Sequence, residues 1–123
     1  MFNIRPAVEQ DIPIISAIYS ALSINNTDRR FLQKVIDGNQ STLLIAEGSS
    51  KEDHNQETSC LGLIILQQQI TPAGTYLPPL NFCYMIDLVV PSSIDNIKIT
   101  KALINAGKNW ASSKGAEYLE IGI

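Results

Sequence analysis

The sequence predicts an α/β fold built on a central mixed sheet of about five strands. Short apolar runs alternate with segments whose apolar residues recur at helical spacing, in the order strand, helix, helix, three strands, helix, strand. Within residues 81–123, a strand, a helix and a strand follow one another through short connections, which predicts a crossover with two parallel strands. The three consecutive strands before that helix are expected to pair as hairpins.

The N-terminal region contributes one strand and two helices. Phe2–Arg5 is the first strand, and Asp11 is a suitable N-cap for the first helix. Thr27 or Asp28 can cap the second helix, which is expected to stop at Gly38. The apolar residues that indicate these helices are Ile14, Ile15, Ile18, Tyr19 and Leu22 in the first, and Phe31, Leu32, Val35 and Ile36 in the second.

The middle of the chain is predicted to form three strands. Ser41–Glu47 and Cys60–Gln68 flank a polar loop at Gly48–Ser59, and Phe82–Val90 is apolar enough to be buried on both faces. The connection Gln69–Leu80 contains three prolines and a glycine, so it is expected to bulge or turn rather than continue either strand.

The third helix has the clearest pattern in the sequence. From Lys98 onward its apolar residues fall on one face, and Lys114 with Gly115 supplies a C-terminal stop signal. The residues of that apolar face are Ile99, Ala102, Leu103, Ala106 and Trp110. Tyr118–Ile123 alternates apolar and other residues and is predicted to be the last strand.

Length, charge and cysteine content limit the function classes. The 123 residues are expected to form one domain, 1–123, and the net charge of -3 is evenly spread, which argues against a nucleic-acid or membrane partner. The run Cys60–Leu66 is too short to span a bilayer, so a cytoplasmic protein is expected. Cys60 and Cys83 are expected to be reduced thiols, His54 a solvated loop residue, and no ligand spacing indicates a metal site.

A ligand site is expected between the fourth strand and the third helix. In a parallel strand–helix–strand unit, ligands bind beyond the C-terminal end of the first strand, where the helix N-terminus offers free N–H groups. In this chain that place is Pro91–Thr100.

Four segments of the sequence, in this order, resemble the GNAT superfamily of acyl-CoA N-acyltransferases. FNIRPAVEQDIPIISAIY is similar to the first strand and helix of that family, and STLLIAE and CLGLIIL to its second and third strands. MIDLVVPSSIDNIKITKALINAGKNWASSKGAEYLEIGI is similar to its fourth strand, pyrophosphate loop, third helix and fifth strand. The resemblance implies a three-layer fold with helices on both faces of the sheet. It also implies transfer of an acyl group from acetyl-CoA or another acyl-CoA to an amine acceptor.

The resemblance also assigns a cofactor site. Backbone groups of Leu88, Val89 and Val90 correspond to those that bind the pantetheine arm, and the pyrophosphate loop corresponds to 95–100. The residues of that loop assigned to cofactor binding are Asn96, Ile97, Lys98, Ile99 and Thr100. In the family this loop reads Gln or Arg, two free positions, Gly, one free position, then Gly or Ala, and none of the three defining residues is present here.

The altered loop predicts weak phosphate binding. Side chains at Lys98 and Thr100 obstruct close approach to the backbone, and the charge of Asp95 opposes a phosphate. Asp95 or Asn96 is also expected to cap the helix and occupy its free N–H groups. The ammonium group of Lys98 has two interpretations, a phosphate contact or a solvated residue of the first turn. We expect acetyl-CoA to bind weakly or not at all.

Asp87 is the candidate catalytic base, because acylation requires removal of a proton from the amine. The alternative is that Asp87 makes a structural hydrogen bond within a buried strand. Tyr84, three residues earlier, is expected to point to the other face, and Tyr19 and Trp110 are expected in the core. In the family, the tyrosine that acts as general acid and the last two strands come after the fifth strand. The resemblance implies that they would follow Ile123, so we expect them to be missing.

Two functions therefore remain open at this stage. One is an acyl-CoA-dependent N-acyltransferase, or a remnant of one that still binds the thioester. The other is a non-catalytic GNAT-like module for protein association. The edge at Tyr118–Ile123, with Leu119, Ile121 and Ile123 on one face, is expected to pair with a second copy in a homodimer.

Overall fold

A computed structural model describes residues 2–22, 29–49, 58–91 and 95–121. Its five-stranded sheet has the order β1-β2-β3-β4-β5, in which the first four strands pair antiparallel and β5 lies parallel to β4. The strands are β1 (Phe2–Pro6), β2 (Ser41–Ser49), β3 (Thr58–Thr71), β4 (Leu80–Val89) and β5 (Leu119–Glu120). The helices are η1 (Glu9–Asp11), α1 (Ile12–Ala21), α2 (Arg29–Asp37) and α3 (Asn96–Ser113).

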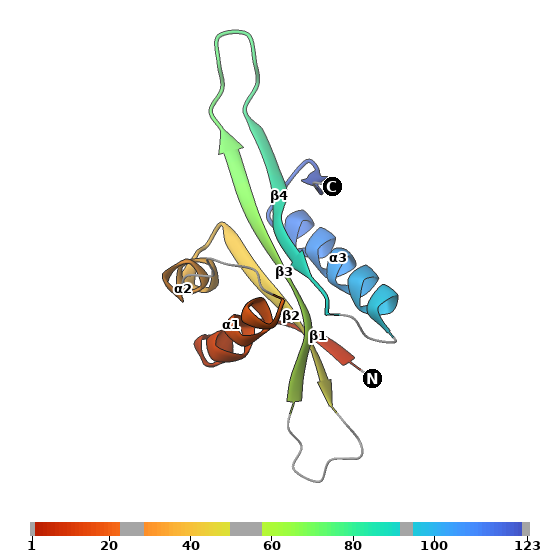
Figure 1. The fold of residues 1–123 in the computed structure, drawn as a ribbon. Helices are drawn as coiled ribbons and strands as arrows, with labels where there is room; N and C mark the ends of the chain where they lie inside the picture. Colours follow the sequence, from red (N-terminus) through yellow and green to blue (C-terminus); the bar gives the residue numbers. More distant parts are fainter. Residues whose placement is uncertain (1, 23–28, 50–57, 92–94, 122–123) are drawn as a thin grey trace.

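The helices cover both faces of the sheet. Figure 1 shows α1 and α2 against one face and α3 against the other. This arrangement confirms the predicted α/β class, the mixed sheet and the three layers. It follows from the alternation of β2 and β3, whose successive apolar residues point to opposite faces and therefore require cover on both sides.

Two hydrophobic clusters fill the spaces between these layers. Leu43, Ile45 and Leu63 face α1 and α2, whereas Leu44, Ile64 and Leu66 face α3. From α3, Ile99 and Leu103 are buried in the second cluster, with Ala106 and Trp110 packed at its margin. The helical face predicted from the sequence is confirmed, although α3 begins two residues earlier than Lys98.

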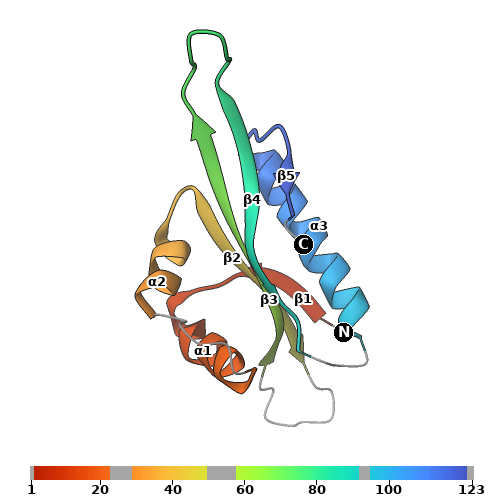
Figure 2. The same ribbon diagram turned by 45° about the horizontal axis from the view of Figure 1, so that its top comes forward.

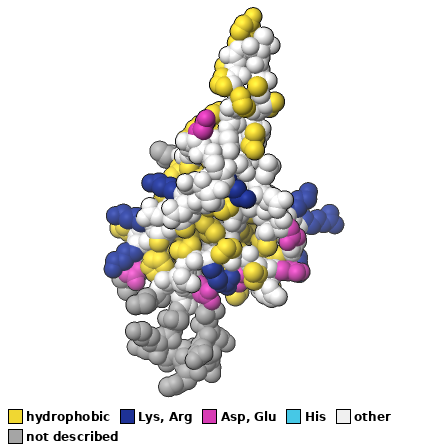
Figure 3. Space-filling model, turned by 180° about the vertical axis from the view of Figure 1, so that it is seen from behind, with side chains coloured by type: hydrophobic (Ala, Val, Ile, Leu, Met, Phe, Trp, Pro, Cys, Tyr) yellow, Lys and Arg dark blue, Asp and Glu magenta, His cyan; other side chains and the backbone are white. Residues whose placement is uncertain are grey.

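The β3–β4 hairpin is longer than predicted. Gln69–Thr71 continues β3 and pairs with Leu80–Phe82, so the prolines confine irregularity to 72–79 instead of 69–80. This hairpin projects beyond the rest of the sheet in Figure 1, and its tip carries hydrophobic side chains in Figure 3. Tyr76 at the tip is 94% exposed and Leu77 is 72% exposed.

β4 is not buried on both faces, which corrects the sequence-based expectation. Most of its side chains are half-buried, and Ile86 is 40% exposed. The pairing of β3 with β4 shifts between Ile65 and Leu66, because Ile65 lies opposite Asp87 and Leu66 opposite Met85. Ile86 is thus the extra residue of a β-bulge.

The bulge also corrects the orientation expected for Tyr84. Tyr84 lies opposite Gln67, and Asp87 lies opposite Ile65. These two partners are at positions i and i+2 of β3. Side chains two apart on a strand share a face, and paired residues point the same way. Tyr84 and Asp87 therefore lie on the same face of the sheet, the face covered by α1 and α2.

β5 is shorter than the predicted strand Tyr118–Ile123. Only Cys83 with Leu119 and Tyr84 with Glu120 are paired, in the parallel sense that the crossover predicts. Leu119 is half-buried and packs against the cluster beneath α3, and the homodimer expected at this edge stays a prediction.

The remaining predictions have mixed outcomes. Asp11 precedes α1 but makes no capping bond with its side chain. Cys60 and Cys83 are both free, as expected. None of the described helices is long and apolar enough to span a membrane. The alternative caps Thr27 and Asp28, the loop residue His54, and Ile123 lie outside the described residues.

Candidate functional site

The C-terminal end of β4 and the first turn of α3 meet above Gly62 of β3. A Cβ atom built on Gly62 would lie 3.1 Å from the carbonyl oxygen of Val89, 3.2 Å from Val90 Cγ2 and 3.3 Å from Ile99 Cγ2. A side chain here would require these neighbours to shift by a few tenths of an ångström. The absence of a side chain at Gly62 therefore lets the start of α3 sit directly over the end of β4.

Among the described residues, no side chain caps the first turn of α3. Asp95 occupies the N-cap position without a capping hydrogen bond, and its carbonyl accepts the N–H of Ile99, at 3.0 Å. This corrects the expectation that Asp95 or Asn96 would satisfy the helix, since Asn96 is already the first helical residue. The N–H groups of Asn96, Ile97 and Lys98 precede the first helical bond and point toward the N-terminal end of the helix.

An open pocket lies beside this turn. Its described lining residues are Asn96, Ile97, Thr100 and Lys101, which recur at helical spacing on one exposed side of α3. Three of these four were candidates from the sequence, and Lys101 was missed. Lys98 is exposed but does not line the pocket, and the side chain of Ile99 is 1% exposed within the core.

One edge of β4 is open beside the same turn. β5 pairs only with Cys83 and Tyr84, so among the described residues no strand pairs with that edge from Met85 to Val89. Of the three candidate backbone positions, Val89 is buried, and Leu88 and Val90 are half-buried. The N–H of Leu88 already donates to Asp87 Oδ1, at 3.0 Å.

Asp87 lies on the α1 side of this edge, held by two hydrogen bonds. The hydroxyl of Tyr19 donates to Asp87 Oδ2 at 2.6 Å, and Tyr19 is 4% exposed, in the core as predicted. Burial, followed by the hydrogen bond to Asp87, raises the pKa of Tyr19, so this side chain remains a protonated donor. Each carboxylate oxygen can accept a further hydrogen bond. The arrangement is therefore compatible with Asp87 as a catalytic base and with Asp87 as a structural hydrogen-bond acceptor.

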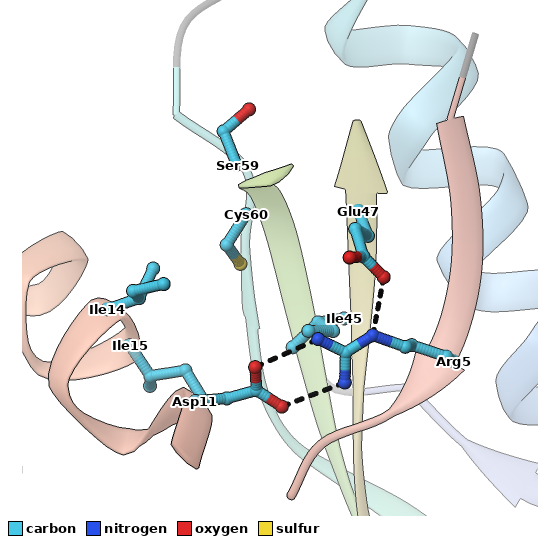
Figure 4. A pocket seen from close by; sticks show the side chains of 8 residues that line it. All are labelled: Arg5, Asp11, Ile14, Ile15, Ile45, Glu47, Ser59 and Cys60. Carbon is cyan, nitrogen blue, oxygen red and sulfur yellow. Dashed lines mark hydrogen bonds and ion pairs between the residues drawn. The ribbon is translucent and has the colours of Figure 1, made fainter. Parts of the chain in front are cut away.

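A second, narrow pocket is lined by Arg5, Asp11, Glu47 and Cys60, among others, as Figure 4 shows. Arg5 donates to both oxygens of Asp11, at 2.8 and 2.9 Å, and to Glu47. The hydrogen bonds from Arg5 hold the pKa of Asp11 below its usual value, and burial raises the pKa of the Cys60 thiol. The charges are mutually satisfied and the thiol is not activated, so this cluster ties β1 to η1 and β2.

The described residues contain no cluster of three or more histidine, cysteine, aspartate or glutamate side chains that could hold a metal ion. The site at the start of α3 thus consists of backbone N–H groups, a lysine and an open strand edge.

Comparison with solved structures identifies the architecture. NAA60 of Arabidopsis thaliana, solved in complex with acetyl-CoA, aligns with a TM-score of 0.73 and 19% identity over 92% of this chain and 69% of that one. The aminoglycoside 6'-N-acetyltransferase AAC(6')-Ih of Acinetobacter baumannii gives 0.74 and 15% over 100% and 80%. A GNAT family acetyltransferase of Staphylococcus aureus gives 0.72 and 13% over 99% and 86%.

The chain has the GNAT fold. At these identities the likeness establishes the architecture of the GNAT fold and leaves the chemistry to be argued from the residues. No family model and no curated protein matches the sequence.

Two functional features of this GNAT fold were missed at the level of sequence. Lys101 could have been found from its spacing, since it lies four residues after Ile97 on the same side of the helix. The contact between Tyr19 and Asp87 joins residues 68 positions apart. No local pattern predicts such a pair.

Proposed function

We propose that this protein binds an acyl-CoA and transfers its acyl group to an amine. The observation that carries the proposal is the uncapped first turn of α3, which opens onto the pocket of Asn96, Ile97, Thr100 and Lys101. The N–H groups of Asn96, Ile97 and Lys98 are suited to a pyrophosphate, and the ammonium group of Lys101 supplies a positive charge beside them. Acetyl-CoA, which the Arabidopsis structure contains, is the simplest ligand of this kind.

The open edge of β4 is proposed to bind the pantetheine arm. An extended amide-containing chain can pair with unpaired backbone groups of a strand, as a peptide does when it adds to a sheet edge. Val90 is the candidate that remains, because the N–H of Leu88 is already engaged by Asp87 and the carbonyl of Val89 lies beside Gly62 of β3. The arm would then direct the thioester toward Asp87 from the start of α3.

Asp87 is proposed to be the proton acceptor. The amine nitrogen attacks the thioester carbonyl, the C–N bond forms, the C–S bond breaks, and the proton of the amine passes to Asp87 while water protonates the thiolate. Tyr19 keeps the carboxylate in place, because its hydroxyl donates to Asp87 Oδ2.

The affinity is proposed to be low. Asp95 carries a negative charge at the N-cap, and the loop has no glycine at Lys98 or Thr100, so the backbone is less accessible than in a glycine-rich cradle. A dissociation constant of about 100 µM corresponds to a binding free energy of about −5.5 kcal/mol, which suits a few phosphate contacts without a cradle.

Calorimetric titration with acetyl-CoA tests the proposal. We expect Lys101→Ala to weaken binding about threefold to tenfold, and more than Lys98→Ala, because only Lys101 lines the pocket. Lys108→Ala, two turns further along the same helix, is the matched control and should leave the affinity unchanged. Absence of binding at 1 mM ligand, roughly ten times the proposed dissociation constant, would refute the proposal.

A second function, protein association, is favoured by the projecting β3–β4 hairpin. Residues 67–84 contain no charged side chain, and Ile70, Tyr76 and Leu77 are exposed at or near the tip. The homodimer expected through the Tyr118–Ile123 edge also remains a proposal, since Ile121 is 37% exposed. Light scattering after size exclusion, with Ile121→Lys as the variant, decides it: a monomer mass at tens of micromolar refutes the homodimer.

Binding of acetyl-CoA distinguishes the two functions, because acyl transfer requires it and protein association does not. A cytoplasmic location is proposed as well, on the ground that both cysteines are free in a fold with no described disulfide.

A further inference from the structure

Three aromatic rings form a continuous strip on the face of the sheet that carries Asp87. The rings of Phe82 and Tyr118 stack with centroids 5.1 Å apart and planes inclined by 8°. The rings of Phe82 and Tyr84 lie 6.2 Å apart at 41°. Phe82 is therefore the central ring, and the two tyrosines flank it.

The strip lies on the α1 and α2 side of the sheet, beyond the part that these helices cover. Phe82 and Tyr84 pair with Gln69 and Gln67, which alternate with residues of the α3 side. None of the three rings belongs to either hydrophobic cluster, and Tyr118 is 46% exposed. Figure 2 shows β5 beside β4, with α1 and α2 toward the other end of the strand.

Two carboxylates of the strands lie on the same face. Glu120 is exposed and pairs with Tyr84, so it points to the same side as the rings, and Asp87 lies on the same face beyond Tyr84. Residues 58–91, which form β3 and β4, include no lysine, arginine or histidine, and Asp87 is their only acid. The two strands that carry most of the strip therefore bring no positive charge to balance these carboxylates.

Aromatic faces and carboxylates attract the same kind of ligand. A cation within about 6 Å of a ring centroid is stabilised by the ring quadrupole, and a nearby carboxylate adds a charge–charge attraction. A neutral amine with an alkyl chain gains neither contribution. A purely structural stack that fastens β5 to β4 needs the pair Phe82 and Tyr118, but it does not need Tyr84 as a third ring.

We propose that the strip of Phe82, Tyr84 and Tyr118, with Glu120, binds a cationic group of the amine acceptor. The inference rests on the proposed acyl transfer, because only that reaction has an amine acceptor. It names the substrate class as an amine that carries a second, positively charged nitrogen. Because the strip ends at Tyr84, short of Asp87 along β4, the second cation binds at the rings while the reacting amine lies at Asp87.

Choline is a suitable probe, because its quaternary nitrogen has no N–H to acylate and its binding needs no acyl donor. Its neutral isostere, 3,3-dimethyl-1-butanol, has the same shape without the charge. Titrations followed by amide and side-chain chemical shifts are expected to place choline at Phe82, Tyr84 and Tyr118. The neutral isostere is expected to bind at least about fivefold more weakly.

Substitution of a ring provides the second measurement. We expect Tyr118→Leu to weaken choline binding about threefold or more, while Tyr76→Leu leaves it unchanged, because Tyr76 is an exposed tyrosine at the hairpin tip, outside the strip. Equal affinity for choline and its isostere would overturn the proposal, as would shifts that persist in Tyr118→Leu and in Tyr84→Leu. Choline binding in the absence of acetyl-CoA binding would support the strip and refute acyl transfer, so the two failures are distinguishable.

Discussion

The hydrogen bond between Tyr19 and Asp87 is the interaction whose loss has the best-defined consequence. Tyr19→Phe removes one hydroxyl from a side chain that is 4% exposed and leaves the ring in place. The hydroxyl donates to a charged carboxylate at 2.6 Å, and a hydrogen bond to a charged group is worth about 1.5–3 kcal/mol. Asp87 is half-buried and keeps the N–H of Leu88, so solvent offsets part of the loss. We expect unfolding to become easier by about 1.5–2 kcal/mol.

Urea unfolding followed by Trp110 fluorescence measures this change. Tyr76→Phe is the matched control, because this tyrosine is 94% exposed and its hydroxyl is expected to matter by less than about 0.5 kcal/mol. In an Asp87→Asn background the same Tyr19→Phe change should cost only about 1 kcal/mol, since the acceptor is neutral. A Tyr19→Phe variant as stable as the wild type would refute the interpretation of this contact.

The pKa of Tyr19 adds a dependence on pH with a definite sign. Burial and the bond to Asp87 raise this pKa above its usual value of about 10, so the folded state holds the proton more tightly than the unfolded chain. The contribution to stability is therefore complete below about pH 10 and is lost as the pH rises further. The wild type should lose stability more steeply than Tyr19→Phe above that pH.

The remaining predictions concern the charged cluster, a turn and the pyrophosphate site. Asp11→Asn should destabilise by about 1.5–3 kcal/mol at pH 7. Because the pKa of Asp11 is lowered in the folded state, the wild type should lose this advantage in stability as the pH falls below about 4. The same stability difference between wild type and Asp11→Asn at about pH 3 and about pH 7 would contradict the ion pair. Gly115→Ala should cost about 1 kcal/mol because Gly115 has a φ of 72°, whereas Gly74→Ala, whose Cβ would make only ordinary van der Waals contact with Leu77, should cost nothing measurable in thermal unfolding. Asp95→Asn should tighten acetyl-CoA about twofold to fivefold in calorimetry, with Glu9→Gln as an unaffected control; equal gains in both would exclude a local charge effect.

The fold was predictable to the extent that local patterns determine it. The spacing of apolar residues indicated the face of α3, the order of elements indicated the parallel β5, and the resemblance to the GNAT superfamily implied helices on both faces. The bulge at Ile86 was not predictable, because it depends on the register between β3 and β4 and leaves no local signal. It reversed the expected side of Tyr84, on which the aromatic strip depends.

The sequence predicts a ligand site at the start of α3, and a pocket lies there; that a cofactor binds in it stays a prediction. The start of α3 follows from the general place of ligands at such a crossover, and Asn96, Ile97 and Thr100 line the pocket there. The capping role assigned to Asp95 was wrong, because N-cap propensity describes an average and not the rotamer adopted at one turn. The partner of Asp87 required the tertiary packing of α1 on the sheet.

Mapping of amide chemical shifts during titration with acetyl-CoA tests the central claim most directly. The account predicts the largest shifts at the N–H groups of Asn96, Ile97 and Lys98, with smaller shifts at Val89 and Val90, and none around Arg5 and Cys60. Shifts confined to the pocket of Arg5 and Cys60, or no shifts at millimolar ligand, would contradict it.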